Sequence, residues 1–219
     1  YEFFLWNGKK MSSSKGLGLT GEELLEVLPP EVARFLMIKT QPNRAVEFNP
    51  KGTDILPKLF DDYQKAAEEY FKKGNEELAR AFELSQIGTI QQPPVIRFSV
   101  LAQWVQMPNM QEEIKKQGLE EWAKYARVYI EKYAPELEKF LIQKDLPQKA
   151  KDLTDKQKEL LKKIAEEIDQ ANDAESFQTQ IYELGKSLGL SGKETFGAIY
   201  TALIGKDHGP KAAWLLLSL

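Results

Sequence analysis

Signals for the beginning and end of α-helices recur along this chain and constrain its fold more than any other feature. The spacing of a capping box, in which two side chains satisfy free backbone N–H groups at a helix start, occurs at Thr20/Glu23, Thr154/Gln157 and Ser191/Glu194. Prolines and glycines interrupt the apolar segments between these starts, as they do where helices end. We therefore predict a mainly α-helical bundle or cage.

Apolar residues at helical spacing define the expected elements. Helices are predicted at residues 20–28, 30–38, 54–72, 75–84, 95–105, 119–133, 135–141, 154–169, 175–188 and 195–204, with one more ending near residue 118 and a last one after Gly209-Pro210. A buried strand is expected in the apolar run 1–6, followed by a turn at Asn7-Gly8, and a brief strand at 45–48. These strands form a small mixed segment in front of the helices.

The proline-rich stretch at residues 88–94 is the clearest boundary in the helical pattern. We predict three parts. Residues 1–19 would end one domain, residues 20–92 would form a connecting segment, and residues 93–219 would form a helical domain.

Composition limits the classes of function. The chain has 219 residues with 42% hydrophobic side chains, enough for a sizeable core, and no cysteine, which excludes disulfides and cysteine-bound zinc. The apolar runs are too short to cross a membrane. The net charge of −3 means that any contact with nucleic acid must come from local patches. We expect no metal site and no membrane partner.

One loop has the residues to contact a phosphate. Between the first strand and the helix at Thr20 lie Lys10, Met11, Ser12, Ser13, Ser14, Lys15 and Gly16. Such a loop lets backbone N–H groups approach an anion, and its lysines supply compact charge. A flexible Ser/Gly linker is the alternative interpretation.

This loop resembles the KMSKS signature of class I aminoacyl-tRNA synthetases, and two further stretches extend the resemblance. Residues 8–16 and 28–35 (LPPEVARF), and then residues 41–50 (QPNRAVEFNP), look like class I lysyl-tRNA synthetase of the archaeal type. The helical remainder is similar in layout to the anticodon-binding part of that family and of glutamyl-tRNA synthetase.

The resemblance implies a two-step reaction: lysine and ATP give lysyl-adenylate and pyrophosphate, and the lysyl group then passes to lysine tRNA. Lys10 matches the first lysine of the motif and would stabilise charge on the leaving pyrophosphate, so we predict it as catalytic. Residues 10–15 would bind ATP. The motif's second lysine falls on Ser13, and either Lys9 or Lys15 could replace it.

The sequence lacks features that the catalytic half of this family requires. A HIGH-type motif contains two histidines, whereas this chain has one, His208. The apolar run that starts at Tyr1 is expected to lack a partner strand in its own chain. We therefore predict a C-terminal fragment of a cytoplasmic, monomeric enzyme, inactive without its N-terminal catalytic half.

Contacts with RNA are predicted near the last inter-helix turns. Cationic side chains there that could meet tRNA phosphates are Lys186, Lys193, Lys206, His208 and Lys211. Ordinary solvated helix ends are the alternative. For the whole chain, two other functions stay open: a fragment of glutamyl-tRNA or another class I synthetase, and a non-catalytic helical module that binds proteins.

Overall fold

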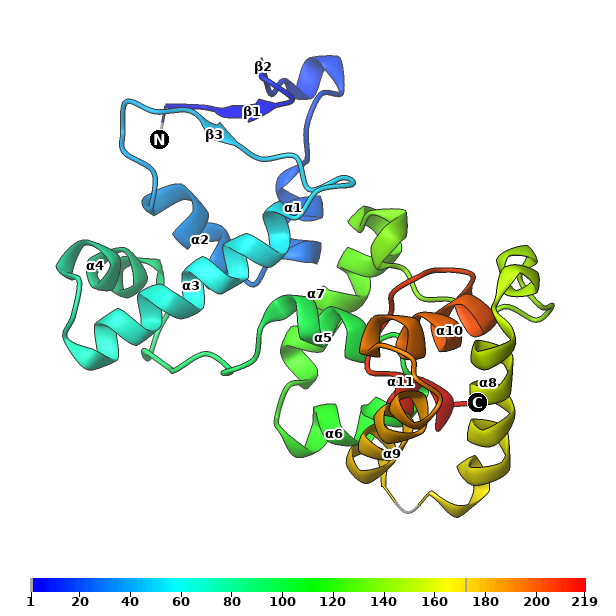
Figure 1. Ribbon diagram of the computed structural model, residues 1–219. Coiled ribbons are helices and arrows are strands. Elements are labelled where there is room, and N and C mark those ends of the chain that lie inside the picture. Colours follow the sequence, from blue (N-terminus) through cyan, green and yellow to red (C-terminus); the bar gives the residue numbers. More distant parts are fainter. Residues whose placement is uncertain (1, 172) are drawn as a thin grey trace. The chain divides into compact units, whose positions relative to one another are not determined.

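The computed structural model describes residues 2–171 and 173–219 and confirms a mainly helical protein with a small sheet (Figure 1). Tyr1, where the first strand was expected to begin, lies outside the described residues. Within them, no helix is both long and apolar enough to cross a membrane.

The strands are β1 (Phe4–Trp6), β2 (Lys9–Lys10) and β3 (Val46–Glu47). The first helices are α1 (Gly21–Val27), α2 (Pro30–Ile38), α3 (Ile55–Lys72), α4 (Glu76–Ser85), α5 (Phe98–Trp104), α6 (Gln111–Lys116) and α7 (Glu120–Val128). The later helices are α8 (Asp155–Glu167), α9 (Ala174–Ser187), α10 (Gly192–Ile204) and α11 (Ala212–Leu216). Capping boxes form at the starts of α1, α8 and α10, as their sequences predict.

The chain divides into two compact units that do not follow one another simply in sequence. Unit 1 comprises Tyr1–Val105 and Ile114–Glu136, and unit 2 comprises Gln106–Glu113 and Leu137–Leu219. Residues 106–113 therefore belong to unit 2, residues 114–136 belong to unit 1, and all residues from 137 onward belong to unit 2.

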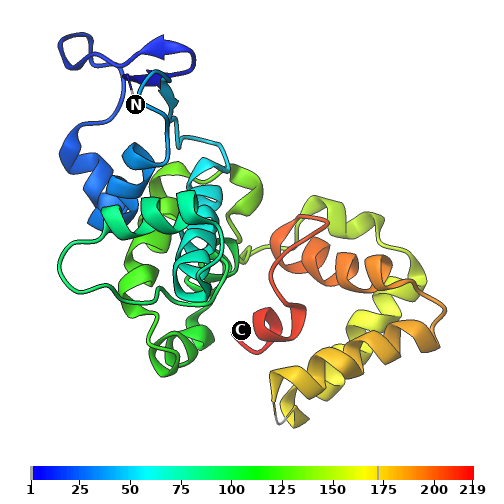
Figure 2. The same cartoon turned by 90° about the vertical axis from the view of Figure 1, so that its left-hand side faces the viewer.

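In unit 1 the sheet has the strand order β2-β1-β3. β1 pairs antiparallel with β2 and parallel with β3, and the views in Figure 1 and Figure 2 both place the three strands at the end of unit 1 near the N-terminus. The expectation that the first strand lacks a partner in its own chain is wrong. Both edges of β1 are paired, one by a strand that follows a two-residue turn and one by a strand about forty residues later.

Aromatic rings dominate the core of unit 1. Phe60 of α3 stacks on Phe98 of α5 with ring centroids 3.9 Å apart, and Trp122 of α7 meets Phe60 edge-on at 4.9 Å. Tyr129, just after α7, is fully buried against Phe98. The helical spacing of these residues thus reflects packing in the core rather than a surface for stacking bases.

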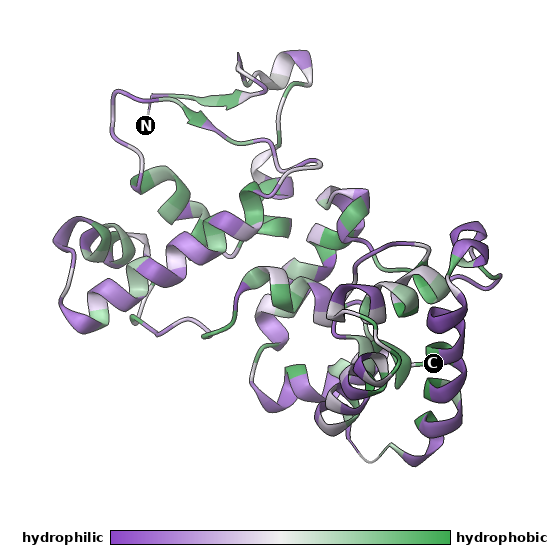
Figure 3. Ribbon diagram, in the orientation of Figure 1, coloured by the Kyte–Doolittle hydropathy of each residue, from purple (hydrophilic) through white to green (hydrophobic). Residues whose placement is uncertain are grey.

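Unit 2 has its own core between α8, α9, α10 and α11. Leu160, Ile164, Phe177, Ile181 and Ile199 are each at most 2% exposed in it. Figure 3 shows the alternation of apolar and polar residues along α8, whose apolar side faces this core. Trp214 of α11 packs partly buried against the same cluster.

The structure differs from the expected helices at two points. Residues 135–141 form only a short 3₁₀ turn at Glu136–Glu138, because the apolar residues that suggested a helix do not share one buried face: Phe140 is buried in the core of unit 2, whereas Leu137 and Leu141 remain 65% and 76% exposed. The helix expected to reach residue 133 changes to a π-helix at Tyr129–Tyr133. At the end of α3, Lys73 adopts the left-handed conformation, with φ of 54°. Gly74 instead leaves room for the Glu69 carboxylate, which accepts a hydrogen bond from the backbone of Asn75.

Candidate functional site

A tight hairpin presents the predicted lysine loop. Asn7 and Gly8 have φ of 51° and 73°, the left-handed conformations that a two-residue type I′ turn needs, and Asn-Gly is the preferred sequence for that turn. The turn sets the pairing of Leu5 with Lys10 and of Trp6 with Lys9. The hairpin therefore fixes the backbone on which the first lysine of the motif stands.

The loop itself is closed at its base by backbone hydrogen bonds. The Met11 N–H donates to the Phe4 carbonyl at 2.9 Å, and Ser12 and Leu17 exchange hydrogen bonds at 2.9 and 3.1 Å. Between them, Ser13–Lys15 form one turn of 3₁₀-helix, and Gly16 closes it with φ of 60°. These backbone hydrogen bonds hold the two ends of the loop, Ser12 and Leu17, together.

Met11 anchors this loop to unit 1. Its side chain is half-buried and packs against the core. It also lies against Gly18, where an added Cβ would come within 2.8 Å of the Met11 sulfur and Cγ. Met11 therefore helps to hold the loop against the core of unit 1.

The lysines of the hairpin and loop are exposed. Adjacent residues of a strand point to opposite faces, so the side chains of Lys9 and Lys10 diverge. The Lys10 ammonium lies 5.0 Å from the centroid of the Phe3 ring. In the described part of the chain, no carboxylate pairs with Lys9, Lys10 or Lys15, which leaves their charges available to an external anion.

The serines of the loop contribute hydroxyl groups. The Ser12 and Ser14 hydroxyl oxygens lie 3.1 Å apart and share a hydrogen bond. The side chain of Ser13 lies outside the described residues. One exposed tip thus combines a lysine and a serine pair, a suitable arrangement for binding an oxyanion.

A carboxylate that the sequence analysis missed holds the hairpin turn. The two oxygens of Glu47, in β3, accept hydrogen bonds from the backbone N–H groups of Asn7 at 2.8 Å and Gly8 at 3.0 Å. The Asn49 side-chain amide donates to the Asn7 side-chain oxygen at 2.8 Å. Glu47 and Asn49 both lie in the stretch 41–50 that carries the resemblance, but their contact with the turn depends on the order of the strands, so no local pattern could have identified it.

The predicted cations of unit 2 are placed in different ways. Lys186 lies in the last turn of α9 and Lys193 in the first turn of α10, and both are exposed. Lys186 stands 3.9 Å from the Glu183 carboxylate, a weak exposed pair. These two lysines flank one turn between helices.

The other three cations are engaged by the protein itself. The Lys206 ammonium donates to the Lys139 carbonyl at 2.7 Å and lies 5.5 Å from the centroid of the Phe140 ring. The Lys211 ammonium lies 4.4 Å from the centroid of the Trp214 ring. Two of the predicted RNA contacts therefore also hold the chain around α10 and α11.

His208 is paired with an acid. Its Nδ1 lies 2.7 Å from the Asp207 carboxylate, and this hydrogen bond lowers the pKa of Asp207 below its usual value. The His208 Nε2 lies 3.3 Å from the Leu137 carbonyl. A cavity of about 420 Å³ next to these groups is lined by both acids and bases, including Lys149, Asp152 and Lys206. Its charge is mixed rather than uniformly positive.

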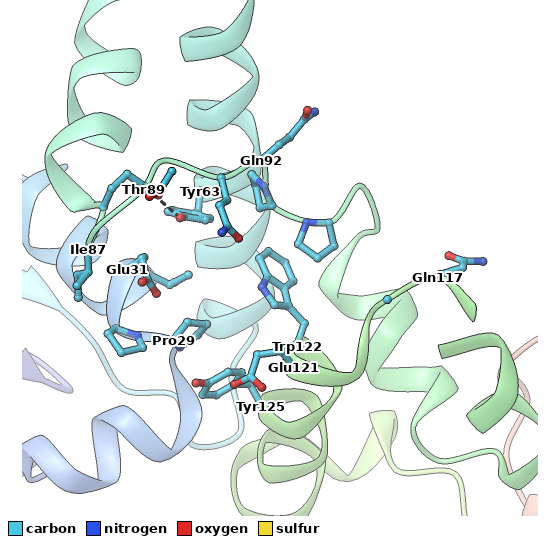
Figure 4. A pocket seen from close by; sticks show the side chains of 17 residues that line it. Pro29, Glu31, Tyr63, Ile87, Thr89, Gln92, Gln117, Glu121, Trp122 and Tyr125 are labelled. Atoms are coloured by element: carbon cyan, nitrogen blue, oxygen red, sulfur yellow. Dashed lines mark hydrogen bonds between the residues drawn. The ribbon is translucent and has the colours of Figure 1, made fainter. Parts of the chain in front are cut away.

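Unit 1 also has an open pocket of about 670 Å³ between α2, α3, α7 and residues 86–94 (Figure 4). Rings of Tyr63, Trp122 and Tyr125 line it together with the carboxylates of Glu31 and Glu121. Burial raises the pKa of Tyr125, and the two carboxylates raise it further. No lysine or arginine lines this pocket among the described residues, so it does not suit a phosphate.

Comparisons with known proteins bear on both units. The family model for class I tRNA synthetases (K) matches residues 1–88, the part that contains the hairpin and loop. The model for the anticodon binding domain matches residues 63–219, more than half of the chain. The chain belongs to the anticodon-binding domain family.

Curated proteins that are similar to this chain carry the same name as the family that the sequence resembles. The lysine–tRNA ligase of Archaeoglobus fulgidus is 32% identical over 235 residues, which cover 100% of this chain and 45% of the relative. Those of Thermoplasma acidophilum and Pyrococcus horikoshii are 31% and 32% identical, again over 100% of this chain and 46% of each relative. The chain therefore spans somewhat less than half the length of these relatives.

Proposed function

We propose that this chain is the C-terminal part of a class I lysyl-tRNA synthetase, which carries the ATP loop and binds the anticodon end of lysine tRNA. One observation carries the proposal: archaeal lysine–tRNA ligases align with the whole chain, from the lysine hairpin to the last helix. The parent reaction would convert lysine, ATP and tRNA into lysyl-tRNA, AMP and pyrophosphate. The parent enzyme would be cytoplasmic and monomeric.

We assign one role to each of the three parts predicted from the sequence. Residues 1–19 would complete the catalytic domain, residues 20–92 would connect it to the rest, and residues 93–219 would bind the anticodon. The class I match over residues 1–88 and the anticodon-binding match over residues 63–219 support this order.

In the activation step, Lys10 would meet negative charge that builds on the departing pyrophosphate. A preorganised cation aimed at charge that develops in the transition state lowers the barrier, and the exposed ammonium of Lys10 is free to take that role. Ser12 and Ser14 would add hydroxyl donors. For the lysine missing at Ser13, Lys15 would be the substitute, because it stands exposed in the same 3₁₀ turn as Ser13, whereas Lys9 points to the opposite face of the hairpin from Lys10.

In RNA binding, Lys186 and Lys193 would contact phosphates at the turn between α9 and α10. Their side chains are exposed, whereas Lys206 and Lys211 already make contacts within unit 2. Lys206, His208 and Lys211 would support the same surface and contribute charge to it. Since the chain carries a net charge of −3, binding would depend on this local patch and weaken with salt.

The test is binding of this 219-residue chain to purified individual tRNAs at one fixed salt concentration. We expect lysine tRNA to bind more tightly than glutamate tRNA. The chain alone should show no lysine-dependent exchange of pyrophosphate with ATP, because the histidine pair of the family is not in its sequence. Absence of RNA binding would favour the protein-interaction module, and equal binding of both tRNAs would place specificity outside this chain.

A further inference from the structure

We propose that Glu47 is a positioning residue for Lys10: its carboxylate clamps the Asn7-Gly8 turn and thereby selects which lysine of the Lys9-Lys10 pair lies on the face of the hairpin that is directed away from the core. The inference rests on the proposed function of the loop. It concerns a residue on β3, outside the lysine motif and about forty positions away in sequence.

The clamp is bidentate. One carboxylate oxygen of Glu47 accepts from the Asn7 N–H at 2.8 Å and the other from the Gly8 N–H at 3.0 Å. Hydrogen bonds to an ionised acceptor are stronger than neutral ones, and successive N–H groups in left-handed turns form a natural cradle for an anion. The carboxylate therefore favours the type I′ turn over other conformations of these two residues.

Asn49 adds a second arm to the clamp. Its side-chain amide donates to the Asn7 side-chain oxygen at 2.8 Å, and its own side-chain oxygen accepts from the Lys51 N–H at 3.0 Å. Asn7 is a non-glycine residue with positive φ, a conformation that asparagine tolerates better than most residues when its short side chain bonds locally. The strained position in the turn is thus held from both its backbone and its side chain.

The turn determines the face on which each lysine lies. Lys10 and Glu47 both stand opposite Leu5, on either side of β1, so the three residues form one rung and share one face. Phe3, two residues from Leu5, lies on that face too, in agreement with the contact of its ring with Lys10. Val46, on the opposite face, is 5% exposed and belongs to the core. The face of Lys10 is therefore the one directed away from the core.

A slip of one residue in the hairpin would exchange Lys10 for Lys9. Because side chains alternate with a period of two, such a slip moves every residue of β2 to the other face. β2 itself consists of two lysines and has no apolar side chain to oppose the slip, so the nearest apolar anchor on this side of the turn is Met11, directly after it. The Glu47 clamp adds a constraint at the turn end of the strand by fixing the length and conformation of the turn.

The experiment is a double-mutant cycle in the full-length protein that contains this chain. Glu47→Gln keeps the shape of the side chain but offers one acceptor oxygen instead of two, and it is combined with Lys10→Ala. Lysine-dependent pyrophosphate exchange gives kcat and the KM for lysine for each variant. Glu22→Gln, at an exposed glutamate in the first turn of α1, is the matched control.

We expect Glu47→Gln to lower kcat about tenfold, a loss of roughly one charge-assisted hydrogen bond, with little change in the KM for lysine. In the Lys10→Ala background the same change should have almost no further effect, since Glu47 acts through Lys10. The proton resonances of the Asn7 and Gly8 amides should shift in Glu47→Gln and not in Glu22→Gln. A thermal melt near that of the parent would confirm folding.

Multiplicative losses in the double mutant would overturn the inference, because Glu47 would then act independently of Lys10. An unchanged kcat in Glu47→Gln, with Lys10→Ala strongly impaired, would also overturn it while leaving the proposed function intact. If Lys10→Ala itself is fully active, the proposed role of the loop fails, and the positioning role fails with it.

Discussion

The lysine hairpin of unit 1 and the last turns of unit 2 carry similar cations in very different states. Lys10 and Lys15 are exposed and unpaired with any carboxylate in the described part of the chain. Lys206, by contrast, donates a hydrogen bond to the Lys139 carbonyl and lies near the Phe140 ring, whereas Lys10 and Lys211 each lie near one aromatic ring. A cation without an internal hydrogen-bond acceptor is available to a ligand, whereas a cation with one first stabilises the fold.

This difference changes how a loss of function should be interpreted. A variant of the hairpin lysines tests chemistry, because their removal breaks no contact of the core. A variant of Lys206 tests chemistry and folding together. The following predictions separate the two situations, starting with the largest effect.

Lys10→Ala in the full-length protein should slow lysine-dependent pyrophosphate exchange by about 100-fold, a typical loss for one preorganised group that stabilises transition-state charge. The KM for lysine should change little, since the charge acts mainly in the transition state. Lys9→Ala, on the other face of the hairpin, is the control and should have a much smaller effect. Equal losses for the two lysines would show that the face of the hairpin is irrelevant.

Unit 2 should lose stability between about pH 10 and pH 12 because of Tyr200. Burial raises the pKa of Tyr200 to about 12, while its hydroxyl donates to the Pro210 carbonyl at 2.6 Å. An unfolded tyrosine titrates near pH 10. The raised pKa therefore stabilises the fold fully below pH 10, and about 3 kcal/mol is lost as the pH rises through 12.

The measurement is urea unfolding at several alkaline pH values for the parent and for Tyr200→Phe. Burial also raises the pKa of Tyr63 in unit 1, so both proteins will lose stability to some extent. The difference between them isolates Tyr200. It should shrink as the pH rises from 10 to 12, and a constant difference would contradict the prediction.

Lys206→Ala should lower the free energy of unfolding by about 1–2 kcal/mol, because it removes a charged hydrogen bond and a cation–π contact. Lys186→Ala, at an exposed position, should change it by less than about 0.5 kcal/mol. Urea unfolding at neutral pH compares the two. If both variants are as stable as the parent, the contacts of Lys206 contribute nothing to the free energy of unfolding, and the contrast between the two regions disappears.

Replacing both Lys186 and Lys193 with alanine should weaken binding of lysine tRNA several-fold without loss of stability. The loss of two phosphate contacts should also reduce the slope of log affinity against log salt by about 1 to 2. Lys162→Ala, at an exposed position of α8, gives a comparison within unit 2. An unchanged salt dependence in the double variant would place the RNA surface elsewhere.

Local signals in the sequence predicted much of the fold. The capping boxes at Thr20, Thr154 and Ser191 form as expected, and Gly205 ends α10 with φ of 69°. These features involve residues within one turn of each other, so the physics that creates them is visible in a short window. The sequence of Asn7-Gly8 likewise predicted its turn.

Features that depend on distant partners escaped prediction. The pairing of β1 with β3 joins strands about forty residues apart, and the apolar pattern of residues 135–141 did not reveal that Phe140 would enter a core while Leu137 and Leu141 stay exposed. In the site, the lysines could be proposed from their motif, but Glu47 could not, because its role exists only after the strands pair. The engagement of Lys206 by the Lys139 carbonyl is hidden from the sequence for the same reason.

The return of the chain from unit 2 to unit 1 imposes an order on folding during synthesis. Unit 1 has all its residues once Glu136 has been made, including the buried ring of Trp122. The partners of residues 106–113 are made later, because unit 2 continues from Leu137 and the Asn109 side chain donates to the Trp214 carbonyl at 2.7 Å. Contacts of such long sequence separation form slowly. The segment that includes the buried side chains of Met107 and Met110 would thus be the most exposed to chaperones and proteases while the ribosome completes unit 2.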